Sequence, residues 1–432
     1  MKMLTRLLGL VTAALLLCGG ALAEAAPGDV LATVNGDAIT RAEFDAYLAP
    51  LMDYYEDNGY DVTDPDTLNE IREMTMSTLV QLRLMEQKIA EMGLVLTETE
   101  RACAAQDGRE AWAADVRNAM SRYGVTDADD EATRAAALVQ VLAELEALGY
   151  TEQSYIDDAV ENALYIKLED QMVGGVTVTD AQIAAGYHER VAAQQEIIGE
   201  DVAFYEYILQ MNKMTLMGYS DSYTELYYRP DGYRSVTHIL LDVEEELLMD
   251  YIDLQAAYEE QQSALEEGAE LAGEVLTAEE LENARLAVLA SVQGEVDAIR
   301  EKLAAGETFA ALIPQFTVDP DMDSAAEIAA GQMVHMDSVY LPIGYRDAAF
   351  SVEEIGGVAE PIVTEEGVYL VCYAGDLAGG GVPLTEDMAD VLRAELQEAA
   401  ETQKYNEVMN GWIAEAELVY SDEALAFMGY ME

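Results

Sequence analysis

The sequence has few of the residues that build metal centres, disulfide frameworks and basic surfaces. Its 432 residues include 3 histidines, 3 cysteines and 22 lysines and arginines, against 84 aspartates and glutamates. The formal net charge of −62 repels the phosphates of nucleic acids and anionic lipids, so we expect direct binding to neither. Because the histidines are scattered at His188, His238 and His335, they exclude a histidine-rich metal centre. The acidic surface is consistent with simple solvation, with basic clients or with bound cations.

What the chain does contain indicates a folded protein with several cores. A length of 432 residues favours two or three domains. The hydrophobic content of 51% argues against a disordered chain. No internal repeat or low-complexity tract is evident, so the architecture must be inferred from local patterns and motifs.

The first residues have the three parts of a secretory signal peptide. Lys2 and Arg6 form a positive segment, residues 7–17 form a short apolar segment, and Ala23 ends a small-x-small cleavage site. The apolar run is too short for a good membrane span. We therefore predict a signal peptide at residues 1–23 and an extracytoplasmic location, secreted or at the cell surface.

The cysteines raise a second interpretation of this segment. Leu15-Leu16-Leu17-Cys18 is similar to a lipobox, which would place a lipid on Cys18 and make it the one link to a membrane. Leu17 departs from the small residue that a lipobox has before its cysteine, so ordinary cleavage is favoured. Cys103 and Cys372 then remain, one in a helical pattern and one in a predicted buried strand. We expect two free thiols rather than a disulfide.

Local patterns predict short strands followed by long helices. Residues 29–34 are typical of a strand, Asn35-Gly36 of a turn, and Thr40 with Glu43 of a helix-capping box. Residues 69–92 carry an apolar stripe at helical spacing that ends at Gly93. Helical patterns continue over 101–172, 245–303 and 386–416. The methionine-rich stripe fits core packing, with a pliable client groove as the other interpretation.

Residues 211–233 combine five tyrosines and three methionines before a Pro-Asp-Gly turn. Aromatic side chains with polar tips suit contact with a peptide, and they equally suit packing of one domain on another. We place the connection between domains in this segment.

Three strings between Arg234 and Asp376 are the most informative part of the chain. They are RSVTHILLD, GETFAALIPQFTVDP and YRDAAFSVEEIGGVAEPIVTEEGVYLVCYAGD, in that order. This succession resembles a parvulin-type peptidyl-prolyl isomerase domain, also called a PpiC or rotamase domain. VLATVNGDAITRAEFDAYL near the start resembles the opening of the SurA/PrsA family of exported foldases.

The resemblance implies an α+β fold, in which a helical SurA/PrsA-like chaperone module carries an inserted parvulin-like domain with a small antiparallel sheet. Residues 24–230 would form the helical chaperone-like region, and residues 231–376 the isomerase domain. Residues 377–432 would return as a C-terminal helix that packs on the N-terminal region. The helical pattern from about 245 to 290 is longer than a compact parvulin needs, so it is predicted to be an insertion. It would shield or widen the client site, or extend as a solvated arm.

The resemblance also implies a site. His238 matches the first histidine of the family's central pair, and Asp319 matches a position that holds aspartate or cysteine. Leu341 and Tyr345 fall where the family places the apolar and aromatic walls of the proline pocket, and Phe350 is expected nearby. The family's second histidine follows a glycine as G-x-H, but GVYLV places Tyr369 there. A tyrosine hydroxyl donates and accepts hydrogen bonds, although the paired-histidine geometry is lost.

The chemistry expected at such a site needs no cofactor and no covalent intermediate. Rotation about an X-Pro bond crosses a barrier of roughly 18–20 kcal/mol, and a catalyst must bind the twisted amide better than either planar form. The expected partners are unfolded or extended exported polypeptides that contain proline. Two alternatives stay open: a holdase that binds such chains without catalysis, and an exported ligand- or cation-binding protein that reuses the fold.

Overall fold

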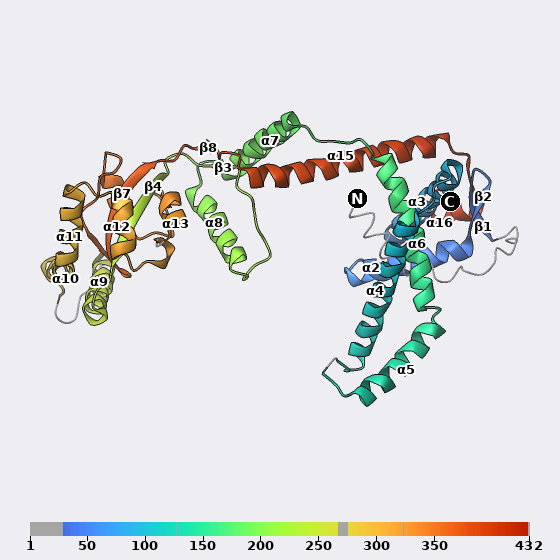
Figure 1. Ribbon diagram of the computed structural model, residues 1–432, viewed down its shortest axis with the longest axis horizontal. Helices are drawn as coiled ribbons and strands as arrows, with labels where there is room; N and C mark the ends of the chain where they lie inside the picture. Colours follow the sequence, from blue (N-terminus) through green and yellow to red (C-terminus); the bar gives the residue numbers. More distant parts are fainter. Residues whose placement is uncertain (1–28, 127, 267–274, 323, 431–432) are drawn as a thin grey trace. The chain divides into compact units, whose positions relative to one another are not determined.

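The computed structural model describes residues 29–126, 128–266, 275–322 and 324–430. The predicted signal peptide and Cys18 lie outside these residues. The described chain is mostly helical with small antiparallel sheets, which confirms the predicted α+β class (Figure 1). It divides into two compact units, the described part of Met1–Thr179 with Arg393–Glu432 (unit 1) and Asp180–Leu392 (unit 2). The domain boundaries predicted at 230 and 376 stay a prediction.

Unit 1 opens with a hairpin whose first strand also pairs with a strand near the end of the chain. The antiparallel sheet has the order β2-β1-β9, built from β1 (Val30–Val34), β2 (Asp37–Thr40) and β9 (Leu418–Tyr420). Asn35 and Gly36 turn the hairpin at φ values of 51° and 95°, the left-handed region that a tight turn requires. The sequence prediction of strand and turn is confirmed.

Capping residues set the helix starts of unit 1. Thr40 accepts from the Glu43 amide, and the Glu43 side chain returns to the Thr40 amide, so α2 (Arg41–Asp57) begins with the predicted capping box. Gly93, at φ 63°, ends α3 as predicted. The other helices of unit 1 are α3 (Pro65–Met92), α4 (Glu98–Arg122), α5 (Glu131–Ala147), α6 (Glu152–Met172), α16 (Asp422–Phe427) and the part of α15 (Glu386–Glu415) from Arg393 onward.

The core of unit 1 joins segments from both ends of the chain. Met76, Leu79 and Met85 of α3 lie in one buried cluster with Tyr405 and Met409 of α15. The predicted methionine-bearing stripe therefore faces a core. α4 and α6 run side by side (Figure 1), and their close approach depends on Gly108, because a Cβ there would lie 2.5 Å from the Tyr155 carbonyl oxygen.

Unit 2 is built around a four-stranded antiparallel sheet of order β5-β4-β7-β6. Its strands are β4 (Arg234–Leu241), β5 (Gln332–Val334), β6 (Ile362–Thr364) and β7 (Gly367–Asp376). β4 and β7 form the centre, and their register places His238 opposite Val371 and Leu240 opposite Tyr369. A separate short ribbon pairs β3 (Tyr228–Arg229) with β8 (Gly380–Gly381).

Unit 2 also contains eight α-helices among its described residues, besides the first residues of α15. They are α7 (Asp180–Ile198), α8 (Val202–Leu216), α9 (Glu245–Glu266), α10 (Ala278–Ser291), α11 (Gln293–Ala304), α12 (Phe309–Phe316), α13 (Ala325–Ala330) and α14 (Ile343–Ser351), with the 3₁₀ turn η2 (Pro320–Met322).

Alternate residues of β4 and β7 serve two different buried clusters, as the two-residue period of a strand requires. Ile239, Leu241 and Leu370 pack with residues of α9, α10, α11 and α12 on one face. Leu240 and Tyr369 pack with α14 on the other face. The predicted helical insertion, which contains α9 and α10, packs on the first of these faces through Leu248, Tyr251 and Val288, which are the buried residues of these two helices.

The tyrosine-rich segment 211–233 packs within unit 2. Tyr227, Tyr228 and Tyr233 are buried there, whereas Tyr219 and Tyr223 are exposed. Cys103 is exposed and Cys372 is buried, and neither forms a disulfide, as predicted. None of the helices in the described ranges combines the length and the apolar character that a membrane span needs.

Candidate functional site

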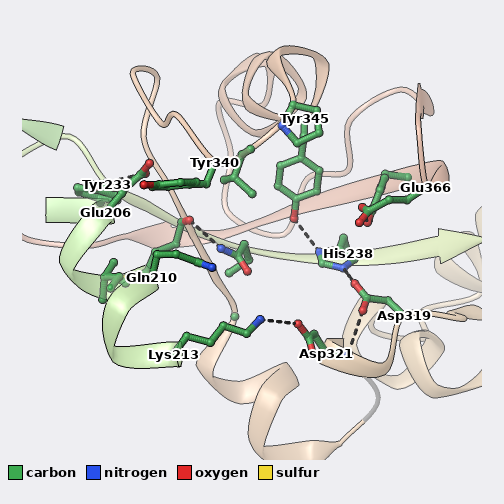
Figure 2. Close-up of a pocket in the computed structure, with 17 residues that line it drawn as sticks. Glu206, Gln210, Lys213, Tyr233, His238, Asp319, Asp321, Tyr340, Tyr345 and Glu366 are labelled. Atoms are coloured by element: carbon green, nitrogen blue, oxygen red, sulfur yellow. Dashed lines mark hydrogen bonds and ion pairs between the residues drawn. The ribbon is translucent and has the colours of Figure 1, made fainter. Parts of the chain in front are cut away.

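A pocket of about 500 Å³ opens in unit 2 on the sheet face that carries His238 and Tyr369 (Figure 2). Its walls come from β4, β7, α8, the start of α14, the turn after α12, and the loop 335–342 that joins β5 to α14. The volume falls in the range of roughly 300–1,000 Å³ that small-molecule and peptide-residue sites occupy. Most of its lining side chains carry a polar group, and the apolar side chains among them are Leu209, Met333, Leu341 and Pro342.

His238 lies at the base of this pocket, and both of its ring nitrogens have partners. Its exposed fraction is 5%. Nδ1 lies 2.7 Å from the Tyr345 hydroxyl, and Nε2 lies 2.6 Å from Asp319 Oδ2 (Figure 2). Burial lowers the pKa of His238 from its ordinary value of 6.5, against the opposite effect of Asp319, so the ring is neutral at pH 7. Because a carboxylate only accepts, Nε2 carries the proton and Nδ1 accepts from Tyr345.

Two tyrosines complete an aromatic layer around this histidine. The ring centroid of His238 lies 5.6 Å from that of Tyr345 and 4.9 Å from that of Tyr369, and the two tyrosine rings are 5.2 Å apart. All three pairs meet edge to face, an arrangement that aromatic quadrupoles favour. Burial raises the pKa of both tyrosines, so both hydroxyls stay protonated and act as donors. The Tyr369 hydroxyl donates to Glu366.

Asp319 is held in place by the edge of β4. The Val318 amide donates to the Leu240 carbonyl at 2.9 Å, and the Leu240 amide donates to the Thr317 hydroxyl at 3.1 Å. The Asp321 amide then donates to Asp319 Oδ1 at 2.8 Å, which leaves Oδ2 for His238. The FTVD string therefore places its carboxylate by docking on the same strand that carries the histidine.

Of the two remaining predicted site residues, Leu341 lines the pocket and Phe350 does not. Leu341 lines the pocket together with Pro342 and Tyr345. Phe350 does not line it: its side chain packs against the same cluster as Tyr345 and Tyr369, with the Arg234 guanidinium 4.6 Å from its ring centre. The reason is helical phase, because Tyr345 and Phe350 are five residues apart and about 140° of rotation separates their directions on one helix.

The largest omission of the sequence prediction is α8. Glu206, Leu209, Gln210 and Lys213 of this helix all line the pocket. Their spacing of three, one and three residues places them on a single helical face. This spacing was the one feature of the sequence that could have revealed them as a group. Without knowledge of what this face contacts, the spacing alone did not indicate a site.

Acidic groups dominate the charge of the pocket walls. Glu206, Asp319, Asp321 and Glu366 line it, and Lys213 is the one lysine or arginine among its lining residues. Lys213 Nζ lies 3.1 Å from Asp321 Oδ2 (Figure 2). In the described part of the chain, no three or more histidine, cysteine, aspartate or glutamate side chains are grouped so that they would hold a metal ion.

A comparison with known families finds one match. Residues 2–115 match the model of the SurA-like N-terminal domain. The chain carries a SurA-like N-terminal domain. The described part of this match contains β1, β2, α2 and α3, together with most of α4. A comparison with curated proteins finds no match.

Solved structures of low similarity align over most of the chain. A structure described for PEB4 and Cj1289, SurA-like chaperones of Campylobacter jejuni, is 8% identical with a TM-score of 0.29 and covers 91% of this chain and 99% of its own. PrsA from Bacillus subtilis is 14% identical with a TM-score of 0.19, at 94% and 99% coverage. The peptidylprolyl isomerase PrsA from Bacillus cereus is 15% identical with a TM-score of 0.19, at 93% and 98% coverage. At these TM-scores nothing about the pocket is inferred from the likeness.

Proposed function

We propose that this protein is an extracytoplasmic protein-folding factor. In this proposal unit 2 is a parvulin-type peptidyl-prolyl cis-trans isomerase, and the SurA-like helical region binds unfolded exported polypeptides. The SurA-like N-terminal domain supports the chaperone part. The signal-like first residues support export, with a lipid on Cys18 as the alternative form of attachment.

One observation supports the isomerase part: a neutral histidine, bonded to a tyrosine on one side and a carboxylate on the other, forms the base of a pocket in which aromatic and apolar side chains stand beside acidic ones. Tyr345, Tyr369 and Leu341 offer a proline ring an apolar surface. An amide that loses conjugation as it twists is less polar than the planar amide, so water exclusion favours the twisted form. The Tyr345 and His238 network fixes the polarity beneath that amide without any covalent step.

A holdase without catalysis is the second candidate, and Tyr369 is the observation that favours it. In place of the family's second histidine, this residue turns its hydroxyl to Glu366 and not to His238. The network beneath the pocket therefore has one histidine where the resemblance leads us to expect a pair. Binding of extended chains in the pocket does not require the pair.

A protease-free prolyl isomerisation assay on short proline peptides, run beside an aggregation assay on an unfolded client, separates the two candidates. We expect acceleration of isomerisation above the buffer rate together with suppressed aggregation. Suppressed aggregation with an isomerisation rate equal to that of buffer would reject the isomerase and leave the holdase. Failure in both assays would reject both.

A further inference from the structure

We propose that Glu206 of α8 is a positioning residue of the proline pocket, because it fixes the loop that carries Leu341. The inference rests on the proposed function and extends the site beyond the parvulin-like segment 231–376. The predicted site residues all fall within that segment, whereas α8 ends before it begins. A carboxylate from outside the segment therefore determines the shape of one wall.

The contacts of Glu206 are made with the loop 335–342. Its two carboxylate oxygens accept separately: Oε1 from the Ser338 hydroxyl, and Oε2 from the Val339 amide at 2.8 Å. The Tyr233 hydroxyl lies 3.5 Å from Oε1. Glu206 is 8% exposed and Ser338 is 1% exposed, so water does not easily replace the bond between these two side chains, whereas Val339 is 56% exposed.

The loop 335–342 also forms hydrogen bonds to residues within the parvulin-like segment 231–376. The Arg346 guanidinium of α14 donates to the Met336 and Ser338 carbonyls at 3.0 and 2.7 Å. The His335 amide donates to the Ser338 hydroxyl oxygen at 3.0 Å. These bonds hold residues 335–338 to α14. The bond to Glu206 fixes the amide of Val339, directly before the pocket-lining residues 340–342.

α8 also reaches the opposite wall of the pocket, next to Asp319. Lys213 Nζ lies 3.1 Å from Asp321 Oδ2, and the Asp321 amide donates to Asp319. The side chains of this ion pair are 60% and 73% exposed, so solvent screens it and it adds little. The buried Glu206 carboxylate is therefore the stronger contact of α8 with the pocket walls. Figure 2 shows Glu206 beside Tyr233.

The chemistry of the contact predicts how substitutions differ. Glu206→Ala leaves the buried Ser338 hydroxyl without this acceptor, and it frees the amide of the exposed Val339 to bond to water instead. In Glu206→Gln, the amide oxygen accepts from Val339, and the amide nitrogen donates to the Ser338 oxygen, because a hydroxyl can reverse its role. The neutral variant thus retains the loop, whereas the truncated variant releases it.

The test measures proline-peptide isomerisation, peptide affinity by fluorescence anisotropy, and amide hydrogen exchange at Val339 in the full chain. For Glu206→Ala we expect a loss of about tenfold in kcat/KM and in affinity, mostly in KM, with faster exchange at Val339. Glu206→Gln should stay within about threefold of wild type. Glu196→Ala, an exposed carboxylate on α7, is the matched control and should change nothing.

Ser338→Ala removes one of the two bonds to Glu206 from the loop side, leaves the bond from the Val339 amide, and serves if Glu206→Ala fails to fold. Wild-type kinetics in both alanine variants, or unchanged exchange at Val339 in Glu206→Ala, would overturn the inference while the proposed function stands. An equal loss in the alanine and glutamine variants would also overturn it, since charge and not position would then matter. A wild-type chain that neither turns over nor binds the peptide overturns the proposed function and this inference together.

Discussion

At the residue scale, His238 gives the pocket its chemical character. It donates to Asp319, accepts from Tyr345 and lies edge to face against Tyr369. A lone histidine on a buried strand is usually only a hydrogen-bonded core residue. This one differs because its partners come from three separate elements that meet at one pocket.

His238→Ala should lower kcat/KM for proline peptides by on the order of tenfold or more, equal to about 1.4 kcal/mol of transition-state stabilisation. It should also cost about 1–3 kcal/mol of stability, because Tyr345 and Asp319 lose a buried partner. Turnover is therefore measured per folded molecule, with folding followed by circular dichroism. The exposed His188→Ala on α7 is the control. Unchanged turnover per folded molecule would assign His238 to the core alone.

The lowered pKa of His238 predicts a pH dependence of stability. Burial disfavours the charged ring, so the unfolded chain takes up a proton at pH values where the folded chain does not. The contribution of the neutral His238 ring to the free energy of unfolding is fully present above the ordinary pKa of 6.5. It is lost as the pH falls below that value. In urea unfolding, the free energy of unfolding of wild type relative to His238→Gln should decrease from about pH 7.5 to about pH 5.5. A relative free energy that rises on acidification would contradict the neutral ring.

At the element scale, the central strands β4 and β7 separate the packed core of unit 2 from its pocket. One face of the pair forms a core with α9 to α12, and the other bears the pocket residues. The insertion around α9 and α10 should therefore affect stability more than chemistry.

Val288→Ala in α10 tests this separation, since Val288 is fully buried. We expect unit 2 to lose about 1.5–3 kcal/mol, with kcat/KM changed less than about twofold. Leu286→Ala on the same helix removes a larger but exposed side chain and should leave stability within about 0.5 kcal/mol. Thermal melts and the peptide assay measure both quantities. A large loss of turnover in folded Val288→Ala would connect the insertion with the pocket.

The same elements show which parts of the structure were predictable. The capping box at Thr40 and the end of α3 at Gly93 were predictable because their signals lie within four residues. His238, Asp319 and Tyr345 came together as the resemblance implied. The wall formed by α8 was not predicted, because the partner of Glu206 is 132 residues away in the chain. Phe350 lies near Tyr345 as expected but does not line the pocket, because the resemblance gave its neighbourhood and not the direction of its side chain on α14.

At the scale of the whole molecule, the charge of −62 dominates. Raising the salt concentration from about 10 mM to about 100 mM shortens the screening length from about 30 Å to about 10 Å and weakens repulsion among carboxylates. We expect Tm to rise by about 2–4 °C, the shift that about 1 kcal/mol produces in units of this size. Differential scanning calorimetry in NaCl measures it, and CaCl₂ at equal ionic strength is the comparison. A much larger rise with calcium would favour the cation-binding alternative, and no rise in either salt would contradict the repulsion.

The sheet of unit 1 sets an order of assembly. β1 stands at the beginning of the described chain, yet one of its two neighbours is β9, and Asn35 also bonds to Glu417 across 382 positions. A chain delivered from its amino end therefore presents its first strand long before the partner arrives. All residues of unit 2 are synthesised after β1 and before β9. Unit 2 can therefore finish folding before the β1–β2 hairpin pairs with β9. β9 completes the three-stranded sheet of unit 1. Deleting the last few dozen residues of the chain would therefore leave this sheet without one of its strands.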